Sequence, residues 1–337
     1  MVRLVQIANG SARRVALVAE PHLICLAGAE SVYELASACM REGVSLSTRA
    51  RELATGEELS YDDIYAGKSE WRLLPPIDVP GMPERVLVSG TGLTHLGSAK
   101  DRQAMHAQAA TEAKPVTDSM RMFEWGIAGG RPKEGEIGVA PEWFYKGSGG
   151  MLQAPFAPIA TPAYAEDGGE EAEVAGIYLI ASDGTPHRIG MCAGNEFSDH
   201  RFERRNYLNL AASKLRQCSI GPELVVGAEF RSVHGEVSIE RGGALLWQKA
   251  IETGEENMAH SLANLEHHHF KFAGHRAPGS VHVHFYGAHS LSFGEGVELK
   301  DRDWMQVRYE GFGRALRNPL RIEDKQLDRL VRVQPVA

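Results

Sequence analysis

Glycine and proline recur along the whole chain and divide its apolar stretches into short runs. The 337 residues include 36 glycines and 16 prolines. Between residues 143 and 233 the apolar runs are short and are separated by glycine, proline and aspartate, which is typical of strands joined by turns. Helical patterns are few and no repeat of fixed length is present. The sequence therefore predicts a strand-rich α+β fold and not a doubly wound parallel sheet.

The first 74 residues have the pattern of a small N-terminal domain. Its expected elements are a hairpin with strands at 4–7 and 15–18, a third strand at 23–26, a helix that opens at Ser31, and a helical continuation over 48–63. The helix start rests on a capping box, because Glu34 follows Ser31 by three residues.

A proline-rich segment follows this domain. Four prolines lie between residues 74 and 83, and proline interrupts helices. We therefore expect a linker over 75–84 and a larger catalytic domain over 85–337. In this second part the expected strands are 85–92, 187–192, 280–287 and 305–311, and the expected helices are 257–270 and a polar segment with Lys100, Asp101, Arg102 and His106.

Net charge and cysteine spacing indicate which kinds of partner the protein has and in which cellular compartment it lies. The net charge is −8 and the isoelectric point about 6.0, which disfavours nucleic-acid binding. No stretch approaches the roughly 18 apolar residues of a membrane span, and the first residues lack the apolar core of a signal peptide. The four cysteines, Cys25, Cys39, Cys192 and Cys218, form no C-x-x-C pair. These features favour a cytoplasmic protein without nucleic-acid or membrane partners.

Two glutamates at the start of an apolar strand are the most informative polar residues. Glu171 and Glu173 are two residues apart, so a strand places both carboxylates on one face. Hard cations such as Mg²⁺, Mn²⁺ or Ca²⁺ bind such oxygen ligands. Glu196, which follows the next expected strand, would complete a three-carboxylate site. The alternative is a solvated strand end with surface acids, and Ser198 or Asp199 is also placed to cap a following helix.

The histidines allow a second interpretation. His282 and His284 alternate on one strand, which is how cupins present metal ligands. We favour instead a strand that lines the cleft, with one histidine facing the substrate. The run 267–269 ends a helix, where histidines suit the helix dipole, and is expected at the surface. The segment 147–150 is expected to be a mobile loop over the site.

The order of short motifs resembles that of the fumarylacetoacetate hydrolase superfamily. The matching segments are Gly92-Leu93-Thr94-His95, Pro141–Ser148, Glu171-Ala172-Glu173, Gly194–Ser198, Lys214 ahead of Gly221-Pro222, Gly313 and Leu316–Pro319. The resemblance spans about residues 85–320. It implies a rolled mixed β-sheet, a homodimer and a small-molecule 2-keto acid substrate.

The resemblance also assigns roles to individual residues. It implies a Mg²⁺ ion, or Mn²⁺ or Ca²⁺ in its place, bound by Glu171, Glu173 and Glu196. The implied catalytic residues are His95, Lys146 and Lys214, and the implied substrate-binding residues are Ser148, Asn195, Ser198 and His289.

Three departures from the family pattern point to one branch. Glu196 stands in place of an aspartate, Gly92-Leu93 in place of Asn-Tyr, and Gly287–Ser290 in place of a G-T-x-x-G turn. These changes resemble the sugar-acid dehydratases. The expected reaction is Mg²⁺-dependent dehydration of a 2-keto-3-deoxy sugar acid, such as 2-keto-3-deoxy-L-arabinonate, to 2-oxoglutarate semialdehyde, as in non-phosphorylating pentose catabolism. The alternatives are hydrolysis of a C–C bond in a 2,4-diketo acid or acylpyruvate, and a non-enzymatic sensor on the same fold.

Overall fold

The N-terminal hairpin forms where the apolar runs predict it. In the computed structural model, which describes residues 1–100 and 117–336, β1 (Val2–Asn9) pairs antiparallel with β2 (Ala12–Ala19), and β3 (His22–Leu26) pairs with β2. The helix α1 (Val32–Glu42) begins after Ser31, whose hydroxyl accepts the amide N–H of Glu34 at 3.2 Å. The predicted hairpin, third strand and capping residue are therefore confirmed.

The helical continuation expected over 48–63 is wrong. This stretch holds the end of α2 (Leu46–Glu52), the strand β4 (Ala54–Ser60) and the start of α3 (Tyr61–Tyr65). β4 pairs with β3 and lies at the edge of the sheet. An edge strand needs backbone partners on one side only, so a polar segment with poor strand propensity is stable there.

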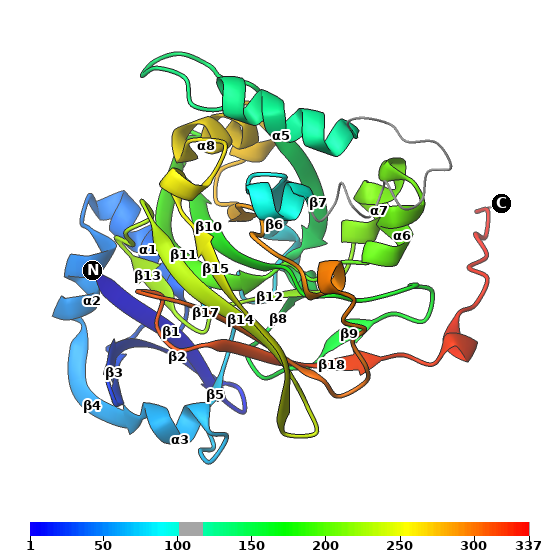
Figure 1. Ribbon diagram of the computed structural model, residues 1–337. Helices are drawn as coiled ribbons and strands as arrows, with labels where there is room; N and C mark the ends of the chain where they lie inside the picture. Colours follow the sequence, from blue (N-terminus) through cyan, green and yellow to red (C-terminus); the bar gives the residue numbers. More distant parts are fainter. Residues whose placement is uncertain (101–116, 337) are drawn as a thin grey trace.

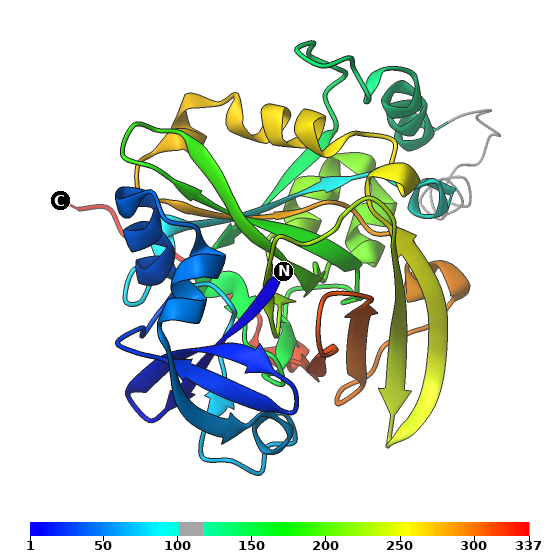
Figure 2. The same ribbon diagram turned by 90° about the vertical axis from the view of Figure 1, so that its left-hand side faces the viewer.

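Two sheets make up the molecule, and the larger one includes the N-terminal strands described above (Figures 1 and 2). A 13-stranded sheet has the main order β4-β3-β2-β1-β13-β11-β10-β16-β6-β7, and a 5-stranded sheet has the order β15-β14-β17-β18-β9. The remaining strands are β5 (Arg72–Leu73), β6 (Val86–Gly92), β7 (Glu142–Ser148), β8 (Leu152–Gln153), β9 (Ile159–Thr161), β10 (Ala172–Ile180), β11 (Pro186–Asn195), β12 (Cys218–Ile220), β13 (Leu224–Val226), β14 (Val233–Arg241), β15 (Ala244–Thr253), β16 (Val281–Phe285), β17 (Trp304–Tyr309) and β18 (Leu316–Ile322). The large sheet is mixed, because β16 and β6 run parallel whereas β10 and β11 run antiparallel.

The helices of the second part are short and lie beside these sheets (Figure 1). They are α5 (Asp118–Gly129), α6 (His200–Arg205), α7 (Leu210–Lys214) and α8 (Leu262–Phe270), with 3₁₀ turns η1 (Pro83–Arg85), η2 (Gly149–Met151), η3 (Tyr207–Asn209), η4 (Glu255–Asn257), η5 (Ala273–Arg276), η6 (Ser292–Glu295) and η7 (Lys325–Leu327). Within the described ranges, no helix is long and apolar enough to cross a membrane. Of the polar helical segment predicted around Lys100, residues 96–100 are helical and Asp101, Arg102 and His106 lie outside the described residues.

Two expectations for this part need correction. The stretch 143–233 is not purely strand, because α6 and α7 follow β11, and Asp199 caps α6 through the amide N–H of Phe202. The helix expected over 257–270 begins only at Leu262, because Ser261 caps it through the amide N–H of Asn264.

The large sheet crosses the predicted boundary between the N-terminal domain and the rest. β1 pairs with β13 through three residue pairs, of which the first is Val2 with Val226. In the segment 75–84, Ile77 is 0% and Val79 3% exposed, and both belong to the same apolar cluster as strands β6, β10 and β16. The division into domains stays a prediction, but the two parts share one sheet and one core.

The strand β10 lies at the centre of this core. All nine of its residues are buried. Ala175, Ile177 and Leu179 pack into the apolar cluster on one face, and Val174 packs into the cluster on the other. A strand covered on both faces holds polar residues only where they are paired, so the glutamates at its start need partners.

Candidate metal centre

Three carboxylates meet where β10 begins and β11 ends. Glu171 precedes β10, Glu173 is its second residue, and Glu196 follows β11. The antiparallel register sets Glu173 opposite Gly194, and the amide N–H of Glu196 donates to the carbonyl oxygen of Glu171 at 2.9 Å. One carboxylate oxygen of each residue lies within 4.8 Å of the other two. The structure thus brings together the three glutamates predicted as metal ligands, and all three are buried.

Two buried lysines compensate this charge. Lys146 on β7 donates to Glu196 Oε1 at 2.5 Å and to the carbonyl oxygens of Phe197 at 2.8 Å and Lys214 at 3.0 Å. Lys214 at the end of α7 donates to Glu171 Oε1 and Glu196 Oε2, both at 2.5 Å, and to Ser198 Oγ at 2.9 Å. A buried charge is tolerated only with such partners. Both predicted lysines therefore lie in the carboxylate cluster, held by three acceptors each.

Ser198 and Asn195 occupy different positions in this cluster. The Ser198 hydroxyl donates to Glu196 Oε2 at 3.1 Å while it accepts from Lys214. Asn195 Oδ1 accepts the amide N–H groups of Glu171 and Phe197, both at 3.2 Å. Ser198 thus lies among the charged groups, whereas Asn195 fixes the backbone that carries two of the glutamates. A role for either in substrate binding stays a prediction.

His200 joins the cluster from the first residue of α6. Its Nε2 lies 3.0 Å from Glu171 Oε1. Burial alone would lower the pKa of His200, but the hydrogen bond and the charge of Glu171 outweigh it and raise the pKa. His200 is not among the residues that the sequence motifs predicted for this site. The available signal was its position four residues after Glu196, just past the Asp199 helix cap.

Glu173 connects the cluster to the turn after β16. Its Oε2 accepts the amide N–H of Gly287 at 2.7 Å. Gly287 has φ of +101°, and a Cβ there would lie 2.0 Å from Thr94 Oγ1, so a side chain is excluded. Burial raises the pKa of Glu173 well above its usual range, and the charges of Glu196 and Glu171 add to this. A cation bound nearby would favour the ionised form instead.

His95 lies on the far side of that turn. Its Nδ1 is 2.9 Å from Thr94 Oγ1, which itself donates to the carbonyl oxygen of Tyr286 at 2.7 Å. Thr94 Oγ1 therefore accepts a hydrogen bond from His95 Nδ1–H. His95 Nε2 carries no proton and accepts a hydrogen bond from the Thr253 hydroxyl at 3.0 Å. Burial lowers the pKa of His95 to about 3. The predicted proton-handling residue is a neutral imidazole linked to Glu173 through Thr94 and the turn.

The last two predicted substrate-binding residues, Ser148 and His289, lie at the end of β7 and in the segment that follows β16. The ring of His289 is 6.1 Å from that of His95. Ser148 ends β7 opposite Leu87 and is half-buried. The segment 147–150 continues into η2, where Gly149 packs against Val86 and Pro83. Its predicted mobility stays a prediction.

Glu170 is a second buried residue beside the cluster that the sequence motifs did not predict. It is fully buried, and its two carboxylate oxygens accept the amide N–H and the hydroxyl of Ser292 at 2.8 and 2.7 Å. These bonds hold η6, which carries Phe293. The Phe293 ring lies 5.2 Å from the ring of His200. Glu170 thus fixes the segment that packs against His200, and the Phe293 ring forms a wall beside that histidine.

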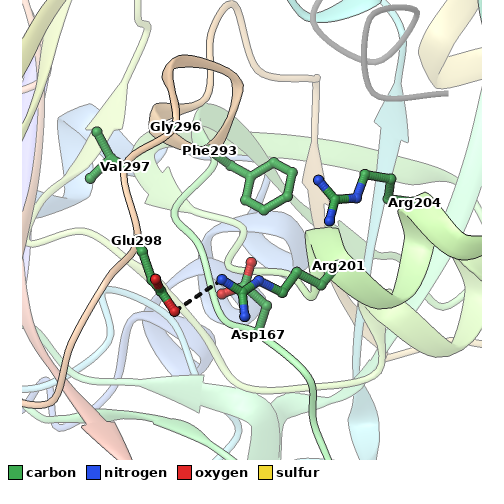
Figure 3. Close-up of a pocket in the computed structure, with 7 residues that line it drawn as sticks. All are labelled: Asp167, Arg201, Arg204, Phe293, Gly296, Val297 and Glu298. Carbon is green, nitrogen blue, oxygen red and sulfur yellow. Dashed lines mark hydrogen bonds and ion pairs between the residues drawn. The ribbon is translucent and has the colours of Figure 1, made fainter. Parts of the chain in front are cut away.

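A cavity of about 320 Å³ lies on the other side of that wall (Figure 3). Its lining residues are Asp167, Arg201, Arg204, Phe293, Gly296, Val297 and Glu298. Arg201 donates to Glu298 Oε1 at 2.9 Å, and the guanidinium of Arg204 lies 5.5 Å from the centre of the Phe293 ring. His200 and Phe293 lie between this cavity and Glu171.

The donor set fits a hard divalent cation. Three carboxylates offer only oxygen ligands, which Mg²⁺ prefers. Opposite ligands of an octahedral Mg²⁺ are about 4.2 Å apart, so oxygens that already lie within 4.8 Å need to move little. The two lysines offset two of the three carboxylate charges. A divalent cation would therefore leave one positive charge, which a singly charged acid could neutralise.

The buried carboxylate cluster lies at the end of a mixed sheet, and comparison with solved structures identifies the fold to which this arrangement belongs. Neither a family model nor a curated protein sequence matches this chain. Among solved structures, a 2-keto-3-deoxyarabinonate dehydratase matches with a TM-score of 0.71 at 18% identity, covering 96% of this chain and 100% of that chain. A 2-keto-3-deoxy-D-arabinonate dehydratase complexed with magnesium and 2,5-dioxopentanoate matches with a TM-score of 0.69 at 17% identity and the same coverage.

A hydrolase with the same fold also matches. Fumarylacetoacetate hydrolase from the psychrophilic Exiguobacterium antarcticum has a TM-score of 0.58 at 16% identity, covering 96% of this chain and 100% of that chain. At these identities the likeness establishes the fold. The chain has the fold of the fumarylacetoacetate hydrolase superfamily, and the resemblance drawn from the motif order is confirmed at that level.

Proposed function

We propose that this protein is a Mg²⁺-dependent dehydratase that converts a 2-keto-3-deoxy sugar acid to 2-oxoglutarate semialdehyde. The observation that carries the proposal is the buried cluster of three glutamates and two lysines. It is supported by the higher TM-scores to the dehydratases, 0.69–0.71, than to the hydrolase, 0.58. Pentose catabolism and a cytoplasmic location belong to the same proposal.

Glu171, Glu173 and Glu196 would hold the cation, which when bound supplies Lewis-acid stabilisation of the negative charge that develops on a 2-keto acid. Lys146 and Lys214 are fixed positive charges at the same place, because all their N–H groups have acceptors. Preorganised charges of this kind need no reorganisation when the substrate becomes more negative.

The proposed reaction breaks the bond between C4 and its hydroxyl oxygen. A base removes a proton from C3, and the electron pair expels the C4 hydroxyl as water. Loss of one proton from C5 and of the proton of the C5 hydroxyl, with return of one proton each to C3 and C4, then gives the C5 aldehyde, so the atoms balance as loss of one water. His95 suits a proton relay, because a neutral imidazole takes a proton at Nε2 and releases one at Nδ1.

The test is an assay of the purified protein with Mg²⁺ in D₂O, followed by NMR. Both substrate classes are offered: a 2-keto-3-deoxypentonate and a 2,4-diketo acid or acylpyruvate. Dehydration predicts a semialdehyde that carries deuterium at C3 and C4. Formation of two carboxylic acids from the diketo acid, with no reaction of the deoxy sugar acid, would identify a hydrolase and reject the proposal. Lys214→Ala is expected to lower turnover in either case, so the product decides.

The homodimer is part of this proposal and has a separate structural argument. In the described sheet β7 is the terminal strand, with one backbone edge unpaired. Trp143 and Tyr145 on its outer face are 36% and 42% exposed. Exposed aromatic residues on an edge strand are typical of a surface that pairs with another chain. Light scattering during size-exclusion chromatography measures the mass of the protein in solution and so distinguishes a dimer from a monomer.

A further inference from the structure

A second cluster of titratable side chains lies away from the carboxylates, beneath α8. It contains His269 at the end of α8, His275 on η5, and His282 and His284 on β16. His269, His282 and His284 are each 1% exposed, and His275 is half-buried. The run 267–269, expected at the surface, is therefore exposed only at His267, because the end of α8 packs on the sheet, where Phe270 contacts Tyr178.

Hydrogen bonds fix which ring nitrogens carry protons in this cluster. The indole N–H of Trp143 can only donate, so His269 Nδ1 accepts it at 3.2 Å and His269 Nε2 carries the proton. That proton is given to His282 Nδ1 at 2.9 Å. His282 Nε2 in turn faces Ser280 Oγ at 3.5 Å, whose own hydroxyl donates to the carbonyl oxygen of Ala277.

His275 is oriented in the way that metal-binding histidines usually are. Its Nδ1 donates to the carbonyl oxygen of His269 at 2.7 Å, so Nε2 keeps a lone pair. Histidine ligands commonly donate their second ring N–H to a backbone carbonyl or a polar oxygen, which fixes the ring. His275 and His282 both have such a partner already.

The three rings are close enough for one ion. One nitrogen from each of His269, His275 and His282 lies within 4.8 Å of the others. Two ligands of a tetrahedral Zn²⁺ are about 3.3 Å apart, and the contact between His269 and His282 is already 2.9 Å. The remaining movement falls on His275, which belongs to a four-residue 3₁₀ turn and not to a strand.

We propose that His269, His275 and His282 form a binding site for a divalent cation that prefers imidazole, such as Zn²⁺, separate from the carboxylate centre. Imidazole nitrogen suits Zn²⁺, Ni²⁺ and Cu²⁺, whereas carboxylate oxygen suits Mg²⁺. The two sites of this chain therefore select different metals.

The cation replaces the proton between His269 and His282. His269 then carries its proton on Nδ1, where the Trp143 indole now donates, so the indole must move aside. Trp143 is 36% exposed, so its side chain is not enclosed by the rest of this chain. Zinc binding is therefore expected to change the fluorescence of Trp143. Trp143→Phe, which keeps the ring and removes the competing donor, is expected to bind zinc about five-fold more tightly, the value of one ordinary hydrogen bond.

The experiment is equilibrium dialysis of the metal-free protein against micromolar Zn²⁺ in excess Mg²⁺, with metals counted by mass spectrometry. The wild-type chain is expected to retain one Zn²⁺ and His275→Ala none, with affinity lowered at least 100-fold. His267→Ala, which removes an exposed imidazole from the same helix, is the matched control and is expected to behave as wild type.

Two further measurements separate this site from the carboxylate centre. Glu171→Gln is expected to keep its Zn²⁺, and His275→Ala is expected to keep Mg²⁺-dependent turnover. Equal zinc retention by wild type and His275→Ala, or loss of zinc in Glu171→Gln alone, would overturn the proposal. Because dialysis counts ions without substrate, it gives its answer whether or not the protein is a dehydratase.

Discussion

Glu196 is the carboxylate that both lysines share. Its Oε1 accepts from Lys146 and its Oε2 from Lys214, each at 2.5 Å, and Ser198 donates to it as well. Shortening this side chain by one methylene withdraws the carboxylate by about 1.5 Å. The family pattern has aspartate at this position, so the backbone and lysines here are fitted to the longer side chain.

Glu196→Asp is therefore expected to reduce activity instead of restoring a family feature. A displacement of about 1 Å in a reacting site costs on the order of 100-fold in rate, and both lysine contacts lengthen together. Turnover and Mg²⁺ affinity of the variant measure this, with the exposed Glu256→Asp as control. Unchanged turnover would show that the position of this carboxylate is not critical.

Lys214→Met tests the charge balance of the cluster. Methionine retains the length of the side chain but leaves Glu171 and Glu196 without one of their cations. Removing one partner of a buried ion pair typically costs about 3 kcal/mol or more. The loss in the free energy of unfolding is expected to be large in EDTA and smaller with saturating Mg²⁺, because a bound cation supplies the missing charge. An equal loss in both conditions would contradict a metal at this place.

At the scale of single residues, motif order located the charged centre and missed its support. Glu171, Glu173, Glu196, Lys146 and Lys214 all lie in the cluster. Strand alternation places Glu171 and Glu173 on one face, whereas Lys146 and Lys214 were implied by the family resemblance in motif order. The remaining residues became visible only in the fold: His200, Glu170 and the buried histidines beneath α8. Their surroundings depend on which distant segments of the chain pack together, and that packing could not be read from the sequence alone.

Among the helices, α5 is fitted to one histidine. A Cβ at Gly126 would lie 2.7 Å from His260 Nε2, and a Cβ at Gly130, just after the helix, would lie 2.6 Å from His260 Nδ1. His260 Nδ1 also faces the Asn264 side-chain amide at 3.1 Å. The two glycines thus leave room for an imidazole between α5 and the start of α8, where it is 2% exposed.

This packing predicts acid sensitivity. Burial lowers the pKa of His260 to about 4, below the value of about 6.5 in an unfolded chain. As the pH falls, the unfolded state takes up the proton first, so stability is retained above about pH 6.5. Between about pH 6.5 and 4 it falls by about 1.4 kcal/mol per pH unit for this group. His260→Gln is expected to reduce the slope by that amount in urea unfolding, and the exposed His187→Gln to leave it unchanged. Identical slopes for wild type and His260→Gln would refute this.

At the scale of elements, strands were predicted better than helix boundaries. Apolar runs identify β1, β2, β3, β6, β16 and β17, because each strand buries its own side chains in the core. β4 was mistaken for helix because its residues are polar and show no strand alternation. Its stability comes from pairing with β3, which lies about thirty residues earlier in the chain. The late start of α8 follows from the Ser261 cap, which the periodicity of apolar residues does not show.

Viewed as a whole, the molecule is tied together across the predicted domain boundary. Glu223 beside β13 accepts the hydroxyl of Tyr61 and the amide N–H of Arg314, both at 3.0 Å, and pairs with Arg3 at 3.0 Å. The N-terminal part, in blue in Figure 2, lies on the side of the molecule opposite the long hairpin of β14 and β15. It is attached through the shared sheet, the shared apolar cluster and side-chain contacts such as those of Glu223.

Limited proteolysis is expected to cut the chain without separating its parts. Residues 81–85 are exposed, whereas Ile77 and Val79 are buried, so trypsin is expected to cleave after Arg85. Two fragments should be seen on a denaturing gel but one peak in size exclusion under native conditions. Separation of the N-terminal fragment without denaturant would show that the β1–β13 pairing is weak. Glu223→Ala is expected to promote separation, because it leaves Tyr61 and Arg3 without their shared acceptor.

The partners of the three glutamates also bear on whether the chain needs a metal ion in order to fold. In many small metalloproteins the ligands repel one another until the ion arrives, so folding waits for metal. Here each glutamate meets a lysine, a serine hydroxyl or a backbone N–H within the fold itself. The chain can thus reach its native structure without a metal ion at this place. Treatment with a chelator is therefore expected to leave the protein folded and able to bind added Mg²⁺.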